Sequence, residues 1–359
     1  MSLLIFILIL GILIIVHEWG HFMAARRVGV RVETFSLGFG PVLFKKKKKH
    51  TEYSLSAIPL GGYVKLAGDN LEEYKGKPDE YFSKRPGERF QIIFAGPLLN
   101  YILGFLLLWL IFFAGYPSLT SKVGGLIDGL GAKEAGLVAG DKIIAVDGRK
   151  VEFWEDLQIA IQKRKVPNLV NLSVMRGSKP LSLDVRIEER DMDDPLGQKR
   201  KVGIIGITPF DEVITVRHGV ADSFFRAINK TLEFTYITYK GLWRMITGKL
   251  SFKESVTGPL GIFDITSKAA GLGIIPLLHL IAVLSISLAL FNLLPLPVLD
   301  GGHIVLLGLE KIRGRTIGIK AERVIMQVGI SFIIFLAIFV TYNDIVRLYG
   351  DKIQKFFLK

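Results

Sequence analysis

The sequence contains no cysteine, which excludes disulfide bonds and thiolate metal sites. Acidic residues are also fewer than basic ones, 33 against 46, so the formal net charge is +13. A balance this basic is typical either of a nucleic-acid-binding protein or of a membrane protein with basic loops beside lipid headgroups. The run Lys45–Lys49 has no interleaved aromatic residues and no known nucleic-acid fold around it. We therefore expect a lipid bilayer, and no nucleic acid, as the partner of this charge.

The features of a removable signal peptide are missing as well. The chain begins MSLL, with no basic region, and residues 2–24 contain no small-residue cleavage site. This pattern predicts that the first apolar stretch is retained as a helix. A repeat of the solenoid type is also absent.

Long apolar runs, by contrast, are abundant. Hydrophobic residues make up 50% of the chain, and the mean hydropathy is +0.41. Both values are too apolar for an ordinary soluble protein and too polar for a chain that lies wholly inside a bilayer. The sequence therefore predicts several spanning helices together with water-exposed parts.

Basic residues after the first apolar run and in the loop 303–323 place those segments in the cytoplasm, with both termini outside. The boundaries that we expect are 1–25 for the first transmembrane helix, 26–89 for a cytoplasmic loop with a membrane-associated β element, 90–115 for the second transmembrane helix, 117–207 for an extracytoplasmic domain, 208–275 for an amphipathic or interfacial helical region, 276–302 for the third transmembrane segment, 303–323 for a cytoplasmic loop, 324–342 for the fourth transmembrane helix and 343–359 for an extracytoplasmic tail.

The first apolar run contains the sequence HEWGH. On a helix, His17 and His21 lie at positions i and i+4 and share one face, where two neutral imidazoles can hold one Zn²⁺ ion. Glu18 can then polarise a metal-bound water as a general base. The alternative is a pair of structural histidines, which is unfavourable because two imidazoles and a carboxyl without partners are expensive in a membrane helix.

A zinc site of this kind needs a third protein ligand. Residues 22–27 read FMAARR, so no ligand follows at the metzincin spacing, and Glu33 lies beyond the basic flank. Another source is the segment NLLPLPVLDGGH, where Asp300 follows a predicted helix break and two glycines allow a sharp turn. Asp300 could equally cap the next segment, and His303 is a rival ligand.

The depths of the two ligand sets agree. His17 lies about 12 Å inside the basic flank of the first span, at about 1.5 Å per helical residue. Asp300 ends the third span, which descends toward the same side of the membrane. We therefore expect both ligand sets in the same half of the bilayer.

HEWGH in the first span and NLLPLPVLDGG in the third resemble the site-2 protease family of intramembrane zinc metalloproteases. A single external domain between spans two and three makes the chain similar to the regulator of sigma-E protease branch. The resemblance implies that His17, His21 and Asp300 bind Zn²⁺ and that Glu18 is the catalytic base. It also implies that Asn292, Pro295 and Pro297 help to hold an unwound substrate helix.

Two further segments match motifs of this family. GPLLN, at Gly96–Asn100, lies in the second span, where plain helix packing explains it at least as well as a catalytic part. PLGGYVKLAGD resembles the membrane-associated β element of the family. Its Gly61 and Gly62 are candidates for an edge to which an extended substrate adds as a strand.

The stretch AGLVAGDKIIAVDGRKV, at Ala135–Val151, resembles a bacterial PDZ domain, with one copy over about 117–207. A PDZ groove binds an extended peptide by strand addition, and we expect its edge at Val123, Gly124, Gly125, Leu126 and Ile127. The approach GLGAKEAGL departs from the usual Ser-Pro-Ala pattern. Binding of a peptide carboxy-terminus is therefore not implied, and a steric gate remains open as an alternative.

The predicted fold class is a multi-pass α-helical membrane protein with four spans, an inserted α+β PDZ-like domain and a small membrane-associated β element. The resemblance implies a zinc endopeptidase of the bacterial inner membrane that cuts trimmed single-span proteins, such as anti-sigma factors, or signal-peptide remnants.

Two other functions compete with this one. A non-catalytic PDZ adaptor with a structural metal site would need the ligands but not Glu18. A metal transporter using the same ligands as a relay would normally show internal repeats.

Overall fold

The computed structural model describes residues 2–162, 168–193, 199–314 and 318–357. The chain forms two compact units. One consists of Met1–Ile111 together with Ser223–Lys359, and we call it the membrane unit. The other, Phe112–Asp222, is the inserted PDZ-like domain.

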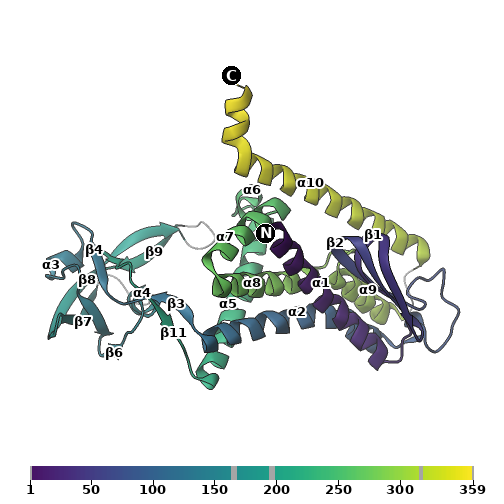
Figure 1. The fold of residues 1–359 in the computed structure, drawn as a ribbon, viewed down its shortest axis with the longest axis horizontal. Coiled ribbons are helices and arrows are strands. Elements are labelled where there is room, and N and C mark those ends of the chain that lie inside the picture. The colour runs from purple at the N-terminus through teal and green to yellow at the C-terminus, as the bar shows by residue number, and fades with distance from the viewer. Residues whose placement is uncertain (1, 163–167, 194–198, 315–317, 358–359) are drawn as a thin grey trace. The chain divides into compact units, whose positions relative to one another are not determined.

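Four helices of the membrane unit are long and apolar enough to cross a bilayer (Figure 1). They are α1 (Ser2–Arg27), α2 (Pro86–Ala114), α8 (Ile274–Asn292) and α10 (Ile319–Phe357, apolar to Leu348). Each rests on a continuous apolar run with at most two charged residues in 18. The prediction of four spans is confirmed.

The expected β element consists of two bent strands, β1 (Val32–Lys48) and β2 (Thr51–Leu66). The first part of β2 pairs with both halves of β1, as in Lys47↔Glu52 and Thr34↔Glu52. The last part of β2 pairs only with the first half of β1, as in Leu37↔Gly62. The result is a small sheet of four half-strands in the order 42–48, 51–56, 34–37 and 62–66.

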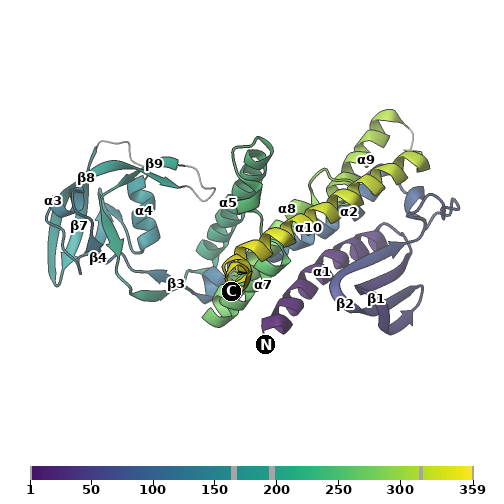
Figure 2. The ribbon, with the colours of Figure 1, turned by 90° about the horizontal axis from the view of Figure 1, so that it is seen from above.

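This small sheet lies beside the C-terminal part of α1 (Figures 1 and 2). A cluster of buried apolar side chains holds it there, drawn from α1, α2 and both strands. Its buried members are Phe22, Ala25, Val30, Val32, Leu66 and Ile92. The 3₁₀ helix η1 (Tyr81–Ser83) then leads into α2.

The PDZ-like domain is an α+β unit, as predicted. Its main sheet has the strand order β6-β5-β7-β8-β9, and the pairs β10-β4 and β11-β3 complete it. The apolar faces of the sheet and of α4 share one core. The elements are β3 (Tyr116–Leu119), β4 (Val123–Leu126), α3 (Gly131–Glu134), β5 (Lys142–Val146), β6 (Arg149–Lys150), α4 (Trp154–Gln162), β7 (Asn168–Arg176), β8 (Lys179–Asp193), β9 (Lys199–Ile204), β10 (Ile207–Pro209) and β11 (Val213–Val216).

Three expected segments differ in form. The region 208–275 begins with β10 and β11 before it becomes α5 (Val220–Ile246), α6 (Phe252–Ser255) and α7 (Pro259–Leu272). The expected loop at 303–323 is largely helical, because α9 runs from Asp300 to Arg313. α9 buries Leu307 on one face, and the basic residues of its last turn interact favourably with the helix dipole. The expected tail at 343–359 continues α10 as helix to Phe357.

Candidate active site

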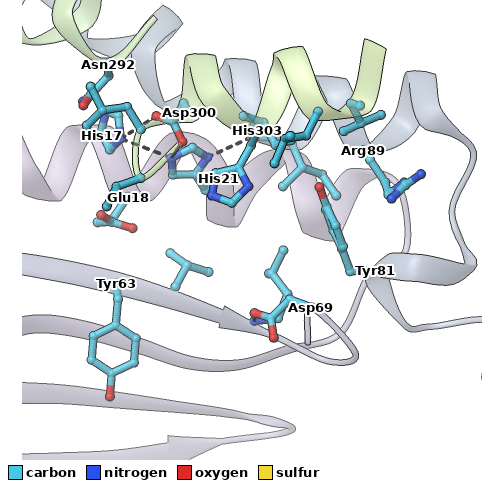
Figure 3. A pocket seen from close by; sticks show the side chains of 18 of the residues that line it. His17, Glu18, His21, Tyr63, Asp69, Tyr81, Arg89, Asn292, Asp300 and His303 are labelled. Atoms are coloured by element: carbon cyan, nitrogen blue, oxygen red, sulfur yellow. Dashed lines mark hydrogen bonds and ion pairs between the residues drawn. The ribbon is translucent and has the colours of Figure 1, made fainter. Parts of the chain in front are cut away.

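Three side chains from α1 and α9 converge on one point (Figure 3). His17 and His21 lie one turn apart on α1, and their Nε2 atoms are 3.2 Å apart. Asp300, in the first turn of α9, places Oδ2 3.2 Å from His17 Nε2 and Oδ1 3.6 Å from His21 Nε2. One ligand atom from each residue lies within 4.8 Å of the other two. The structure thus brings together the three side chains predicted as metal ligands.

The spacing of these atoms suits zinc. A tetrahedral ion at about 2.0–2.2 Å from each nitrogen or oxygen sets its ligand atoms about 3.3–3.5 Å apart. The two Nε2 atoms are 3.2 Å apart, and each lies 3.2–3.6 Å from one of the two oxygens of the Asp300 carboxylate, so the three side chains are close enough to share one ion. Two imidazoles and one carboxylate also leave the fourth position of a tetrahedral ion open, as in catalytic sites.

The outer ring nitrogens of the two histidines contact α2. His21 Nδ1 lies 2.8 Å from the carbonyl oxygen of Ile92, so it donates its proton there and leaves Nε2 free for a metal. His17 Nδ1 lies 3.5 Å from the side-chain nitrogen of Asn100. The Asn100 side-chain oxygen is buried and has no partner in the described part of the chain.

Turning the Asn100 amide by 180° satisfies both groups. The side-chain oxygen then accepts the proton of His17 Nδ1, and the orphaned acceptor is paired. Nitrogen and oxygen of an amide are assigned from such networks. With the amide in this orientation, both histidines present Nε2 to the site in the same tautomer.

The GPLLN motif explains how α2 comes this close to α1. A Cβ at Gly96 would lie 2.3 Å from His21 Nε2, so only glycine fits at this position. One turn later, Asn100 reaches His17. The motif thus combines close packing with contact to a histidine of the cluster, and plain packing alone does not account for it.

The helix break predicted before Asp300 is present. α8 ends at Asn292 and α9 begins at Asp300. The two glycines after Asp300 do not form the sharp turn that we expected, because both lie in the first turn of α9. A Cβ at Gly302 would lie 2.0 Å from the carbonyl oxygen of Leu296. The glycines let the segment 293–299 pack against the helix and so fix where Asp300 stands.

A cavity of about 450 Å³ surrounds the cluster. Glu18, Asn292 and Gly62 line it, as expected of the catalytic and substrate-handling residues. Pro295, Pro297 and Gly61 are not among its lining residues in the described part of the chain. His303 lines the cavity but contributes no atom to the three-residue cluster.

Comparison with known proteins settles the family of this chain. A model of peptidase family M50 matches residues 5–336. The chain belongs to peptidase family M50. The predicted membership of the site-2 protease family is thereby confirmed, and the protein is a metalloendopeptidase of that type.

The alignments with curated relatives extend over almost the whole length of the M50 peptidase. Proteins of Rickettsia conorii and Agrobacterium fabrum, both named as candidate zinc metalloproteases, are 35% and 34% identical to it. These matches cover 98% and 96% of this chain and 100% and 96% of the relatives. The regulator of sigma-W protease RasP of Bacillus subtilis is 28% identical over 96% of this chain and 98% of its own length. The names of the first two imply zinc as the metal of the family.

Among solved structures, the PDZ domain of an SdrC-like protein from Listeria monocytogenes aligns with the M50 peptidase at 27% identity. The alignment covers 25% of this chain and 86% of that domain, with a TM-score of 0.20.

Glu18 of the M50 peptidase faces the small sheet. A Cβ at Gly62 would lie 3.2 Å from Glu18 Cγ, so β2 passes directly beside this carboxylate. Figure 3 shows Glu18 in the space between α1 and the strand that carries Tyr63. The Gly62–Leu66 half-strand pairs on one side with the first half of β1, and Gly62, Tyr63, Val64 and Leu66 line the cavity.

A polar group at the far end of the cavity was not predicted from the sequence. Arg89 and Glu310 form an ion pair of 2.7 Å with only 7% and 12% of their side chains exposed. Tyr81 and Asp69 line the same end, and burial raises the pKa of both groups above their ordinary values. Arg89 stands one residue before the apolar run assigned to the second span, and a charge at that position was the available signal.

The predicted PDZ groove must be corrected. A cavity of about 370 Å³ lies between α4, the end of β8 and the segment Gly203–Ile207, and of the five predicted residues only Ile127 lines it. Val123–Leu126 instead form β4, which pairs with β10. Val123 is fully buried in the core. The outer strand of the main sheet is β9, and its last residues, Gly203 and Ile204, line this cavity.

Proposed function

We propose that this M50 peptidase is a zinc-dependent endopeptidase that cuts transmembrane segments within the bilayer. The convergence of His17, His21 and Asp300 beside Glu18, in a cavity walled by apolar helices, carries this proposal. An adaptor with a structural metal site would require the three ligands but not an acidic side chain facing the same cavity.

His17, His21 and Asp300 would hold the ion and would leave one position open to water. When bound, zinc polarises the substrate carbonyl and lowers the pKa of water at that position. Glu18 takes the proton of the attacking water and delivers it to the leaving nitrogen of the peptide. Ile92 and Asn100 keep the imidazoles in the tautomer that this chemistry requires.

A transmembrane substrate must unwind before it can be cut, because a helix hides its carbonyl groups in its own hydrogen bonds. The cavity-lining half-strand Gly62–Leu66 offers an edge on which an extended segment can add as a strand beside Glu18. Asn292, at the end of α8, also lines the cavity and offers a side-chain amide to unpaired backbone groups.

The substrates that we propose are single-span proteins already shortened by another protease, of the anti-sigma-factor type, or remnant signal peptides. The similarity to RasP, which is named as a regulator of sigma-W, supports the first class. We place the enzyme in the bacterial inner membrane with the PDZ-like domain outside, where it excludes untrimmed proteins by size or binds their ends.

Cleavage of a single-span reporter in liposomes tests the mechanism. We expect Glu18→Gln to keep about one zinc ion per chain and to lose about 10³-fold in rate, because it removes the base but no ligand. Glu33→Gln is the matched control, since Glu33 pairs with Arg31 and Lys65 outside the cavity. It should cut like the wild type.

Two results would overturn the proposal. Equal cleavage by Glu18→Gln would show that Glu18 is not the base. Failure of the zinc-loaded wild type on several unrelated reporters would favour an adaptor.

A further inference from the structure

The end of β1 and the turn after it carry five lysines in a row, Lys45–Lys49, which we call the lysine edge. Lys45–Lys48 pair with β2 in the register Lys45↔Ser54 to Lys48↔Thr51, and the turn follows at Lys49. All five side chains and the next residue, His50, are exposed. Lysines on an outer strand prevent other chains from pairing with it. That role alone does not require five consecutive charges.

One hydrogen bond and one close contact fix the position of the lysine edge along α1. Thr51, just after the turn, donates its hydroxyl to the carbonyl oxygen of Val32 at 2.9 Å. Val32 follows closely on the basic last turn of α1, which contains Arg26 and Arg27. At the other end of the sheet, Gly62 lies beside Ile14 and Glu18, in the apolar middle of α1. The lysine edge therefore stands at the basic end of the first span.

The same half-strand is apolar before it becomes basic. Val42, Leu43 and Phe44 expose 51%, 68% and 64% of their surface. The lysines follow immediately. An exposed apolar segment that ends in lysines at the level of a basic helix end matches the change from lipid tails to headgroups.

Little negative charge of the protein itself balances the lysine edge. Lys45 lies 3.8 Å from Glu52. In the described part of the chain, Lys46–Lys49 form no ion pair. Each lysine held near an anionic membrane favours contact with it by about fivefold. Four unbalanced lysines in one short edge thus form a strong site for anionic headgroups.

We propose that the lysine edge binds anionic lipid headgroups and anchors the small sheet at the membrane surface. The opposite edge of the same sheet is Gly62–Leu66, which lines the cavity beside Glu18. Binding of anionic lipid at the lysine edge would therefore stabilise the packing of the Gly62–Leu66 edge against α1. The effect on cleavage, unlike the binding itself, rests on the proposed function.

The absence of cysteine makes a direct measurement possible. A fluorophore on His50→Cys in the full chain, in lipid nanodiscs, reports contact with spin-labelled headgroups. The test variant is K46Q/K47Q/K48Q. The matched control K142Q/K150Q/K179Q removes the same charge from exposed lysines of the PDZ-like domain. K46R/K47R/K48R keeps the charge.

At low salt, we expect quenching by spin-labelled phosphatidylglycerol to exceed that by spin-labelled phosphatidylcholine about fivefold or more. The ratio should fall toward one at about 1 M salt, where the Debye length is only about 3 Å. The glutamine variant, which keeps Lys45 and Lys49, should give a clearly lower ratio, while the arginine variant and the control keep the wild-type ratio. Equal quenching by both lipids in the wild type would overturn the proposal. So would a short RNA that binds the edge more tightly than the anionic lipid does.

Reporter cleavage in the same nanodiscs tests the second step. We expect the wild type to cut faster when anionic lipid is present, and the glutamine variant to lose this dependence. A wild type that cuts equally well with and without anionic lipid would overturn the coupling. If the wild type cuts nothing in any lipid, the proposed function fails, but the quenching ratio still decides whether the edge binds lipid.

Discussion

Asn100 shows how one side chain on α2 determines the chemistry of a residue on α1. Its side chain meets His17, and its backbone oxygen accepts a hydrogen bond of 2.7 Å from Ser285 on α8. The residue is fully buried at the meeting point of three spans. Orientation of His17 therefore depends on how these helices pack.

Asn100→Ala should weaken zinc binding about 10- to 100-fold, as is typical when a partner of a ligating histidine is removed. Competition with a chelator measures this change. Ser285→Ala is the matched control, because it removes a hydrogen bond to Asn100 without altering the amide that meets His17. An equal loss of affinity in both variants would mean that Asn100 acts through packing alone.

Asp141 makes the PDZ-like domain sensitive to acid. Burial alone would raise the pKa of this carboxyl, but two hydrogen bonds from Arg176 and one from the Val138 N–H hold it below its usual value. A lowered pKa contributes stability above the unfolded-state value of about 3.9, and this stability is lost as the pH falls through the folded-state pKa.

Asp141→Asn should cost the domain about 2 kcal/mol at pH 7 and remove the acid sensitivity that Asp141 confers. Hydrogen exchange of β5 in the full chain measures both effects. Asp128→Asn serves as the control, since Asp128 pairs with Lys133 at an exposed site and its loss should leave exchange unchanged. Unaltered exchange in Asp141→Asn would contradict the argument.

The histidine pair was predictable because its information is local, whereas Asp300 became the third predicted ligand only through the family resemblance. The spacing of His17 and His21 is one helical turn, and the proline-rich break marks Asp300. Asn100 and Arg89 were not recognised as partners of other elements, because their partners His17 and Glu310 lie 83 and 221 residues away. Such contacts form only when helices pack, so no local sequence pattern predicts them.

At the scale of elements, the segment 293–299 holds Asp300 by packing closely against α9. Gly302→Ala should force this contact apart, because the new Cβ would lie 2.0 Å from the Leu296 oxygen. We expect a loss of about 1–3 kcal/mol in stability, together with weaker zinc binding. Thermal unfolding and chelator competition test both expectations.

Gly308→Ala is the matched control on the same helix, since its Cβ would meet no atom within 4 Å. Alanine favours the helix over glycine, so this variant should gain up to about 1 kcal/mol. Equal behaviour of the two variants would show that the close approach at Gly302 does not matter.

A carboxylate of α10 caps another helix. Asp344 is fully buried and accepts hydrogen bonds from the backbone nitrogens of Gly258 and Gly261 at the start of α7. Asp344→Leu leaves both groups unpaired and should cost about 3 kcal/mol. Asp344→Asn keeps one acceptor and should cost less. If Asp344 caps α7, both variants should speed hydrogen exchange at the start of α7. If Asp344 matters only within α10, exchange there should not change.

Helices were easier to predict than the small sheet for a physical reason. A continuous apolar run determines a spanning helix within itself, as in α1 and α8. β1 and β2 bend and pair twice, and this register depends on residues as far apart in the sequence as Val32 and Leu66, which are paired. The prediction of the PDZ groove was wrong because it also depended on a distant pairing. β10 pairs with the edge of β4 that we expected to be free for a peptide.

At the scale of the whole molecule, charge predicts on which side of the membrane each part lies. In single-cysteine variants, Lys150→Cys of the PDZ-like domain should react with an impermeant maleimide in intact cells. His50→Cys, beside the lysine edge, should react only after the membrane is opened. The cysteine-free parent provides a blank. The reverse pattern would invert the proposed topology.

The contact between α1 and α9 also has a consequence for the order of events during synthesis of the chain. The ribosome adds roughly 5–20 residues per second, so tens of seconds separate the synthesis of His21 from that of Asp300. During that interval the nascent chain carries two imidazoles in the membrane without the carboxylate that completes their set. The cluster of the three predicted metal ligands is therefore complete only after Asp300 has been synthesised.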